Sequence, residues 1–398
     1  MGGHASRDGA CCGDAFLLVI SRTLCRLLCS KPIFSPSYIA ARHRFREAAV
    51  AARARIHAYE IGESAPTGEP LSLEVATLGA REPAHVLLLT SGLHGVEGFF
   101  GSAVQLAWLS LVAAGEIVLP PRVPVVLAHA LNPYGFAWRR RVNEHNVDLN
   151  RNFLDEKENE AYAGTPSRYM SVHGLLNPKR FASGFGSRLL FASRVRWAVK
   201  RLGLAVFRTA VAAGQYEYPR DLFFGGFKAS SSNVFVKDQF DFWTGKAEGV
   251  LHLDLHTGLG EYASYQLLVE VANKPHLTWY QKHFDPQNVV SVSDDGLYAA
   301  RGVMGNWLGR NAAATNYHFA CVKFGTYSAI RVLHALRSEN HTHHHSNIGS
   351  LEYTRSKSGL LECFCPRSEL WRTNAMARAI ELLRKALTAV QQVGDNSG

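Results

Sequence analysis

Two histidines and one glutamate stand where buried strands are expected to end. Residues 85–91 read "HVLLLTS", nearly pure hydrocarbon, and the Gly-rich stretch after them carries His94 and Glu97. A later run, "VLHLDLH", alternates leucine with polar residues and ends in His256. Because the exits of neighbouring parallel strands meet at one edge of a sheet, the three side chains can converge there. Two histidines, a glutamate and one open position form the ligand set of one type of catalytic zinc site.

Each of these residues also has an ordinary explanation. His94 can cap a turn, Glu97 can open a helix, and His256 can bond a backbone carbonyl. A His-x-x-Glu pair is a loose pattern when it stands alone. Spacing by itself therefore leaves both metal binding and plain structural roles open.

The strands and helices that must position these residues are predicted from apolar runs and from the Gly, Asn-Pro or Thr-Gly residues that follow them. Four runs are typical of buried strands: residues 85–91, 123–131, 250–256 and 319–325. Helical spacing is seen over 37–60 and 98–117, and the chain closes with a helix whose apolar stripe is Met376, Ile380, Leu383, Leu387 and Val390. Strands alternating with helices predict an α/β fold, with a mixed, largely parallel central sheet flanked by helices.

Length and charge limit the classes of protein that fit. The 398 residues, 47% of them hydrophobic, predict one domain at 34–393 between tails at 1–33 and 394–398. The formal charge of +10 is concentrated between Lys179 and Arg208, within a predicted insertion at about 156–226. No aromatic-and-basic ladder accompanies it, which argues against a nucleic-acid partner. We expect the insertion to pack as a lid, the alternative being a basic surface for anionic lipid.

The N-terminus and the cysteines bear on localisation. "MGGHAS" matches the myristoylation pattern at Gly2, and Cys11 and Cys12 would supply a second acyl chain. We therefore expect a cytoplasmic protein that can associate with a membrane surface through lipidation, the alternative being an accidental match in an unstructured tail. The three cysteines within the domain form no disulfide framework, which favours a reducing compartment.

A longer set of motifs resembles the zinc carboxypeptidase superfamily. In that superfamily a His-x-x-Glu pair, an Asn-Pro-x-Gly turn, an Arg, an Asp-x-Asn-Arg-Asn run and a strand-borne His occur in this order, as they do here. The resemblance spans residue 34 to the C-terminal helix and is closest to a branch without an assigned substrate, through "GLHGVEG", "NPYGFAW", "VDLNRNF" and "DLHTGLG". It implies a zinc carboxypeptidase-like fold and one Zn2+ held by His94, Glu97 and His256, with Asp148 bracing a ligating histidine.

The same resemblance implies how a substrate would be held. Arg141 matches the arginine that stabilises the developing oxyanion. Asn150 and Arg151 match the pair that binds the terminal carboxylate of the substrate, where a guanidinium can form a forked contact. By contrast, Arg139 and Arg140 are expected to face solvent.

The sequence departs from the superfamily at the catalytic base. A glutamate is expected in the phrase Glu-Phe-Gly-Thr, but this chain reads "VKFGTY" and has Lys323. Glu339 and Glu362 are the nearby acids, one of which we expect to pair with Lys323, and a lysine with a lowered pKa could itself accept a proton. We expect a zinc-dependent carboxypeptidase or amidohydrolase that cleaves an amide bond of a small-molecule or peptide substrate with a free carboxylate. The alternative is a catalytically impaired binding or scaffold protein.

Overall fold

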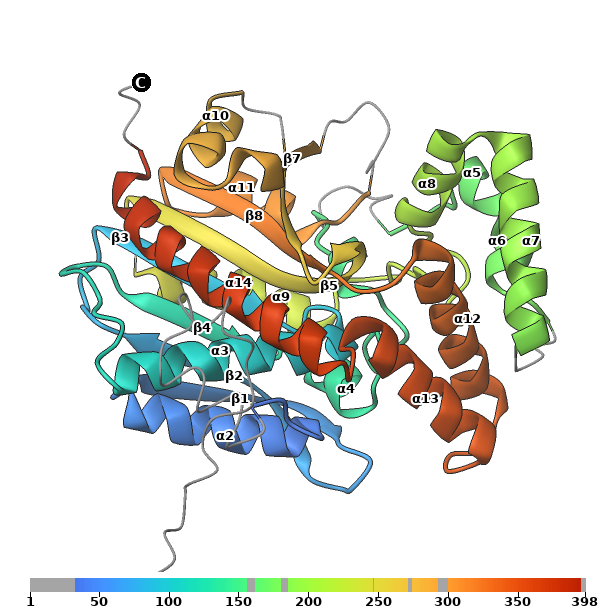
Figure 1. Ribbon diagram of the computed structural model, residues 1–398, viewed down its shortest axis with the longest axis horizontal. Helices are drawn as coiled ribbons and strands as arrows, with labels where there is room; N and C mark the ends of the chain where they lie inside the picture. Colours follow the sequence, from blue (N-terminus) through green and yellow to red (C-terminus); the bar gives the residue numbers. More distant parts are fainter. Residues whose placement is uncertain are drawn as a thin grey trace, which may run out of the picture.

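The computed structural model describes residues 33–155, 162–179, 185–245, 247–270, 274–292 and 300–394. Within them, one eight-stranded sheet has the order β1-β2-β4-β3-β5-β8-β6-β7 (Figure 1). Neighbours among β4, β3, β5 and β8 are parallel, whereas β1 on β2, β2 on β4 and β6 on β8 are antiparallel. The predicted mixed, largely parallel sheet is confirmed. Its strands are β1 (Arg55–Ser64), β2 (Pro70–Leu78), β3 (His85–Ser91), β4 (Val125–His129), β5 (Gly249–Tyr262), β6 (Tyr265–Glu270), β7 (Val289–Val292) and β8 (Asn316–Gly325).

Helices cover both faces of the sheet (Figure 1). Successive residues of a strand point to opposite faces of the sheet, and the apolar side chains of each face pack against a separate group of helices. Among the described residues, one helical stretch, Gly95–Ala113, has the length and apolarity of a membrane span, and 78% of its most apolar window is buried inside the protein. The first group is α2 (Tyr38–Ala51), α3 (Gly98–Ala113), α10 (Lys274–His283) and α14 (Glu369–Ala389), and the second is α9 (Ser231–Thr244) and α11 (Met304–Asn311).

The expected helix over residues 37–60 is correct only in its first part. α2 ends at Ala51, Arg53 adopts a left-handed φ of 59°, and from Arg55 the chain forms an edge strand paired with β2. A right-handed helix cannot continue through that φ. Pairing with β2 then overrides the helical spacing of the remaining sequence.

The predicted insertion forms a helical layer at one end of the molecule (Figure 1). Val96, which lies between two predicted metal ligands, belongs to the apolar cluster of this layer. The apolar residues of α7 do not all pack as expected: Val195 is buried, but Leu189 and Trp197 are 56% and 62% exposed. The layer consists of α5 (Ser167–Met170), α6 (His173–Leu176), α7 (Phe185–Leu202) and α8 (Leu204–Ala212), packed against α12 (Ala329–His345) and α13 (Leu351–Phe364).

Candidate metal centre

Close backbone contacts hold the segment that carries the first two predicted ligands. β3 leads into the 3-10 turn η1 (Gly95–Glu97), which continues directly into α3. Gly95 lies against the short helix α4 (Pro133–Ala137), so that a Cβ added to it would come within 2.1 Å of the Gly135 carbonyl carbon. Only glycine fits at that distance, which explains why "HGVE" and "NPYG" occur together in this sequence.

The structure brings the three predicted ligands together. One ligand atom from each of His94, Glu97 and His256 lies within 4.8 Å of the others, and all three residues are buried. Each histidine points Nδ1 at Glu97, at 3.0 Å from Oε1 for His94 and 3.0 Å from Oε2 for His256. Their Nε2 atoms face other carboxylates, Asp148 at 3.2 Å and Asp254 at 2.5 Å. Both histidines are thus braced so that Nδ1 points at the common centre.

The buried carboxylates around this centre need cations, either protonated histidines or a metal ion. Burial alone would raise the pKa values of Glu97, Asp148 and Asp254, but Arg141 for Asp148 and the histidines for the other two lower them below their ordinary values. The three carboxylates are therefore ionised. Arg141 hydrogen-bonds to two of them, Asp148 and Glu97. Metal ligation requires neutral histidines, and with both of them neutral the three negative charges face Arg141 as their nearby cation, which leaves an excess that a divalent cation would neutralise.

The donor set suits zinc. Two imidazole nitrogens and a carboxylate oxygen are typical zinc ligands, and a carboxylate on the second nitrogen of each imidazole fixes the tautomer. Burial lowers the pKa of His256, but the charges of Asp254 and Glu97 outweigh that effect and hold the pKa well above its ordinary value. The metal-free protein therefore keeps a proton on His256, which a metal ion on Nδ1 would displace.

Asp254 is a residue of this centre that the sequence analysis missed. Its Oδ1 accepts a hydrogen bond from Thr90 Oγ1 at 2.6 Å, while Oδ2 faces His256. Thr90 Oγ1 also lies 2.8 Å from Nε2 of His252, whose Nδ1 lies 2.8 Å from the Tyr317 hydroxyl. A signal existed in the alternation "HLDLH", because residues two apart on a strand share one face. Asp254 and His256 were therefore bound to be neighbours.

Arg141 lies against the ligands and is 15% exposed. Its Nε donates to Asp148 at 3.0 Å, and its Nη2 lies 2.7 Å from Nε2 of His94. That Nε2 cannot serve both neighbours at once, because it must accept from Arg141 but donate to Asp148. A metal ion on Nδ1 requires the proton on Nε2, which selects Asp148 and releases Nη2 of Arg141.

The predicted carboxylate-binding pair lies on the 3-10 turn η2 (Leu149–Arg151). The Asn150 side chain accepts a hydrogen bond from the backbone of Met304 at 3.0 Å. Arg151 is 7% exposed and donates to the backbone carbonyls of Ala212 and Asn150 at 2.8 and 2.6 Å. The pair follows Asp148 closely in the sequence. Its binding of a substrate carboxylate stays a prediction.

The prediction that Arg140 faces solvent is wrong. Its side chain is fully buried, and its Nε donates to Glu339 Oε1 at 2.9 Å. Lys357 Nζ contacts the same oxygen at 2.6 Å. The segment is internal because its backbone supports η1, with the Arg140 carbonyl accepting from Val96 N at 2.8 Å. Arg139, by comparison, is only partly buried.

The three candidates for the catalytic base lie in different places. Lys323, on β8, is half-buried and in register with His256 on β5, so its side chain shares the face that carries the metal ligands. Glu339 is bound to Arg140. Glu362, on α13, accepts from the Tyr327 hydroxyl at 2.6 Å.

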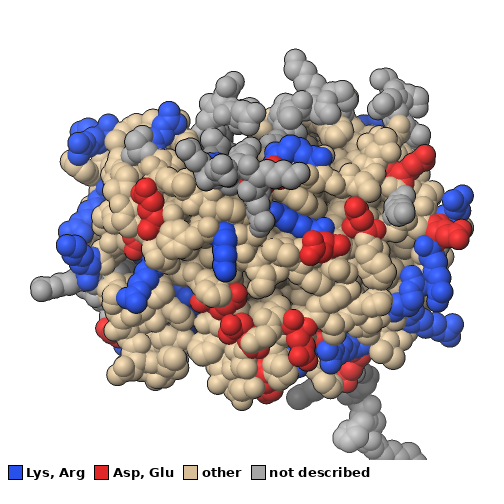
Figure 2. All heavy atoms as spheres, turned by 180° about the vertical axis from the view of Figure 1, so that it is seen from behind, with Lys and Arg blue, Asp and Glu red and all other residues tan. Residues whose placement is uncertain are grey.

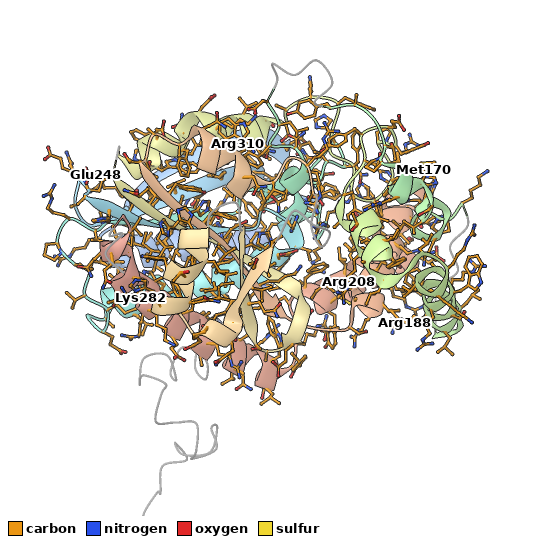
Figure 3. All side chains as sticks on the ribbon, turned by 90° about the horizontal axis from the view of Figure 1, so that it is seen from above. Met170, Arg188, Arg208, Glu248, Lys282 and Arg310 are labelled. Carbon is orange, nitrogen blue, oxygen red and sulfur yellow. The ribbon has the colours of Figure 1, made fainter. Side chains whose placement is uncertain are left out.

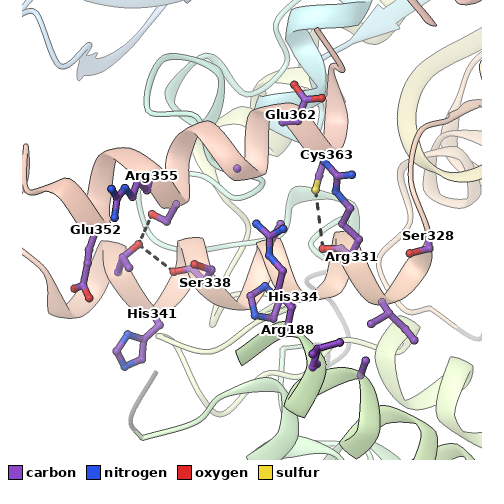
Figure 4. A pocket seen from close by; sticks show the side chains of 17 residues that line it. Arg188, Ser328, Arg331, His334, Ser338, His341, Glu352, Arg355, Glu362 and Cys363 are labelled. Carbon is purple, nitrogen blue, oxygen red and sulfur yellow. Dashed lines mark hydrogen bonds between the residues drawn. The ribbon is translucent and has the colours of Figure 1, made fainter. Parts of the chain in front are cut away.

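Glu362 also lines a cavity of about 630 Å³ between α7, α12 and α13, to which no ligand of the metal centre contributes (Figure 4). Among the described residues, Lys323 forms no ion pair with either acid, because Glu339 pairs with Arg140 and Lys357 instead. The expected pairing of Lys323 is therefore not found. Catalytic roles for Lys323 and Glu362 stay predictions.

Three solved structures illustrate what the chain is similar to. Carboxypeptidase A from Helicoverpa armigera is 13% identical with a TM-score of 0.43, over 89% of this chain and 74% of that chain. Thrombin activatable fibrinolysis inhibitor is 13% identical with a TM-score of 0.47, over 93% and 77% of the two chains. Succinylglutamate desuccinylase from Chromobacterium violaceum is 14% identical with a TM-score of 0.32, over 84% and 75%.

A family comparison covers nearly the whole predicted domain. No curated protein matches the sequence. Residues 34–378 match the family described as "Protein of unknown function (DUF2817)". The expectation of a branch without an assigned function is thereby confirmed, and the chain belongs to this DUF2817 family.

Proposed function

We propose that this protein is a zinc-dependent hydrolase of the carboxypeptidase or amidohydrolase type, which cleaves an amide bond in a small substrate that bears a carboxylate. The observation that carries the proposal is the buried centre of His94, Glu97 and His256, whose ligand atoms converge within 4.8 Å and whose surroundings carry excess negative charge when the histidines are neutral. A purely structural ion cluster is stable only when its charges are paired internally. This cluster is completed by a cation.

Three residues would bind the metal ion, and two carboxylates would orient the histidines among them. His94 Nδ1, His256 Nδ1 and the Glu97 carboxylate are the ligands, and Asp148 and Asp254 keep the proton of each imidazole on Nε2. When bound, zinc supplies a Lewis acid that polarises a carbonyl and activates water for attack. The burial of the ligands excludes bulk water and strengthens each of these interactions.

Arg141 meets the next requirement of amide hydrolysis. Attack on a carbonyl places negative charge on its oxygen, and a guanidinium at that position stabilises the transition state more than the neutral substrate. The Nη2 atom 2.7 Å from His94 is the group that metal binding releases. Arg141 therefore becomes available for the substrate oxygen when the metal is present.

Arg151 is the reason to expect a carboxylate in the substrate. A guanidinium close to a metal ion is favoured when an anion lies between them, and its planar shape matches a carboxylate in two hydrogen bonds. In the structure its Nε donates to the Ala212 carbonyl at 2.8 Å. Binding a substrate carboxylate would exchange this neutral acceptor for a charged one.

Lys323 favours a second candidate function. The side chain at this register position shares the face of His256, where a hydrolase of this type needs a carboxylate base. A chain that holds the metal and the carboxylate but lacks the base would bind its ligand without cleaving it. The protein would then serve as a binding or scaffold protein.

Metal analysis with a matched pair of compounds tests both functions. Zinc-loaded protein is assayed on an N-acyl amino acid and on the same compound capped as a carboxamide. We expect one zinc per chain and a preference for the free acid of at least about tenfold. Arg151→Lys should diminish this preference, because lysine cannot form the two parallel hydrogen bonds that a guanidinium forms with a carboxylate. Zinc and selective binding without turnover would support the second function. A protein that takes up no zinc after supplementation would rule out both.

A further inference from the structure

The positive charge of this protein is confined to one segment. Residues 161–216 contain nine Lys and Arg and no Asp or Glu, whereas the rest of the chain has 34 Lys and Arg against 33 Asp and Glu. The formal charge of +10 thus belongs almost entirely to the helical layer of α5 to α8. In Figure 2, Lys and Arg gather along the left edge, where this layer lies in that view. A layer without acids of its own attracts anionic surfaces.

α7 forms the outer edge of the layer (Figure 1), and Arg188 and Arg208 mark this end of the molecule in Figure 3. Phe191, Val195 and Ala198, at spacings of four and three residues, are buried against the neighbouring helices. The opposite side of α7 is exposed. Together with Leu204 at the start of α8, these exposed side chains form what we call the α7 surface, in which Leu189 lies at the rim of the cavity between α7, α12 and α13: Leu189, Leu190, Arg194, Arg196, Trp197, Lys200 and Arg201.

Large apolar side chains are exposed among these cations. Leu189, Leu190 and Trp197 are 56%, 54% and 62% exposed, and Leu204 is 50% exposed. The Arg201 guanidinium lies 5.4 Å from the centre of the Trp197 ring. Exposed apolar groups that gather in one place mark an interaction site. Leucine and tryptophan among lysine and arginine are typical of a helix that lies in the headgroup region of a bilayer.

We propose that the α7 surface docks on an anionic lipid bilayer, with the axis of α7 parallel to the membrane. The cations would contact lipid phosphates and carboxylates, and the leucines and Trp197 would enter the acyl boundary. A nucleic acid would satisfy the cations but leave Leu189 and Leu190 without apolar contact. A second copy of this chain would place two surfaces of like charge against each other.

This docking needs no lipidation. Gly2, Cys11 and Cys12 of the predicted acylation motif lie outside the described residues, so the α7 surface is an independent observation. It also does not depend on the metal centre, because none of its residues contacts the ligands. Membrane binding should therefore be the same with and without zinc.

Vesicle sedimentation tests the proposal on the full chain carrying Gly2→Ala, which cannot be myristoylated. The probes are vesicles of phosphatidylcholine alone and of phosphatidylcholine with about 30% phosphatidylserine. We expect the partition coefficient to be at least about tenfold higher on the anionic vesicles, and Arg194→Glu/Arg196→Glu/Lys200→Glu to abolish this difference. Trp197→Ser, which changes no charge, should lower the coefficient about threefold or more.

A matched triple variant separates the α7 surface from net charge. Arg53→Glu/Arg81→Glu/Lys282→Glu makes the same change of charge at exposed positions on other elements, and it should keep most of the binding. Equal loss in both triple variants, or no preference for anionic vesicles, would overturn the proposal. So would binding to a single-stranded RNA homopolymer but not to vesicles, or a dimer in light scattering that Trp197→Ser dissociates.

Discussion

Arg140 and Arg141 are neighbours in the chain, yet they belong to two buried charge clusters that differ in kind. Arg140 lies with Lys357 around Glu339, and both cations contact the same carboxylate oxygen. Arg141 lies with the metal ligands, where its guanidinium contacts the carboxylates of Asp148 and Glu97. The first cluster has more cations than anions and no converging acceptors. The second has more anions than cations once its histidines are neutral, and its ligand atoms converge on one centre.

The difference shows that burial and charge alone do not mark a functional site. Burial would raise the pKa of Glu339, but Arg140 and Lys357 lower it to about 2, so the carboxylate is ionised and fully paired within the chain. At the metal centre, Asp148 and Glu97 are also ionised, but part of their pairing is with histidines that must lose a proton to bind a metal ion. A site that binds a ligand is recognised by what its own residues leave unsatisfied.

The largest effect is expected from His256→Ala, which removes one of the three ligands. Two ligands hold zinc too weakly to survive dialysis, so the metal content should fall from about one to below about 0.1 per chain. The circular dichroism spectrum should stay unchanged. Metal analysis by mass spectrometry checks this, with His145→Ala as the control because its side chain is 78% exposed. Equal zinc in both variants would contradict the assignment.

Glu339→Gln, in contrast, should lower the stability of the fold and leave the zinc content unchanged. It leaves Arg140 and Lys357 buried without their counter-ion, which costs about 3–5 kcal/mol of unfolding free energy. Denaturant unfolding measures the loss, and Glu47→Gln is a matched change at a side chain that is 66% exposed. If Glu339→Gln also emptied the metal site, the two clusters would not be separate.

The loss of stability at acid pH gives a second test of the difference between the Glu339 cluster and the metal centre. The folded-state pKa of Glu339, about 2, lies below the unfolded value of about 4.3. A lowered carboxyl pKa stabilises the fold above the unfolded value and loses that contribution as the pH falls through the folded value. The difference in stability between wild type and Glu339→Gln should therefore shrink between about pH 4.5 and pH 2, which unfolding at several pH values would measure. A constant difference would mean that Glu339 is not ionised in the native state.

The fold was predictable where the sequence carries local signals. β3, β4 and the first ten residues of β5 are buried on both faces, β8 is buried on one face, and all four strands contain apolar runs. β1 and β2 were not found, because β1 is an edge strand of mixed polarity and follows alanine-rich helical sequence. The Arg140 cluster was beyond sequence reasoning, since Arg140 and Glu339 are 199 residues apart. The metal ligands could be predicted because they lie in recognisable sequence motifs.

Asp254→Asn tests the residue of the metal centre to which the sequence analysis gave no role. The amide keeps the shape of the side chain but loses the charge that holds the proton on His256 Nε2, so zinc affinity should fall about 10–100-fold with the fold intact. Competition with a chelating dye measures the affinity. Thr90→Val, which removes the hydrogen bond at 2.6 Å to Asp254, should act in the same direction but less. An unchanged zinc affinity in Asp254→Asn would mean that the contact with His256 has no role in holding the metal.

Lys323→Glu carries the smallest expected effect and decides between the two proposed functions. Lys323 is in register with His256, so a glutamate there would lie on the face of the metal ligands, where a general base is needed. We expect weak or absent hydrolysis in the wild type, and a gain of at least about tenfold on an N-acyl amino acid in the variant, the lower range for a restored base. Lys282→Glu, on an exposed helix position, is the control for the change in net charge. Strong wild-type activity that persists after removal of both Glu339 and Glu362 would assign proton transfer to Lys323 itself. No gain from Lys323→Glu, with zinc still bound, would mean that the base belongs at another position on this face of the sheet.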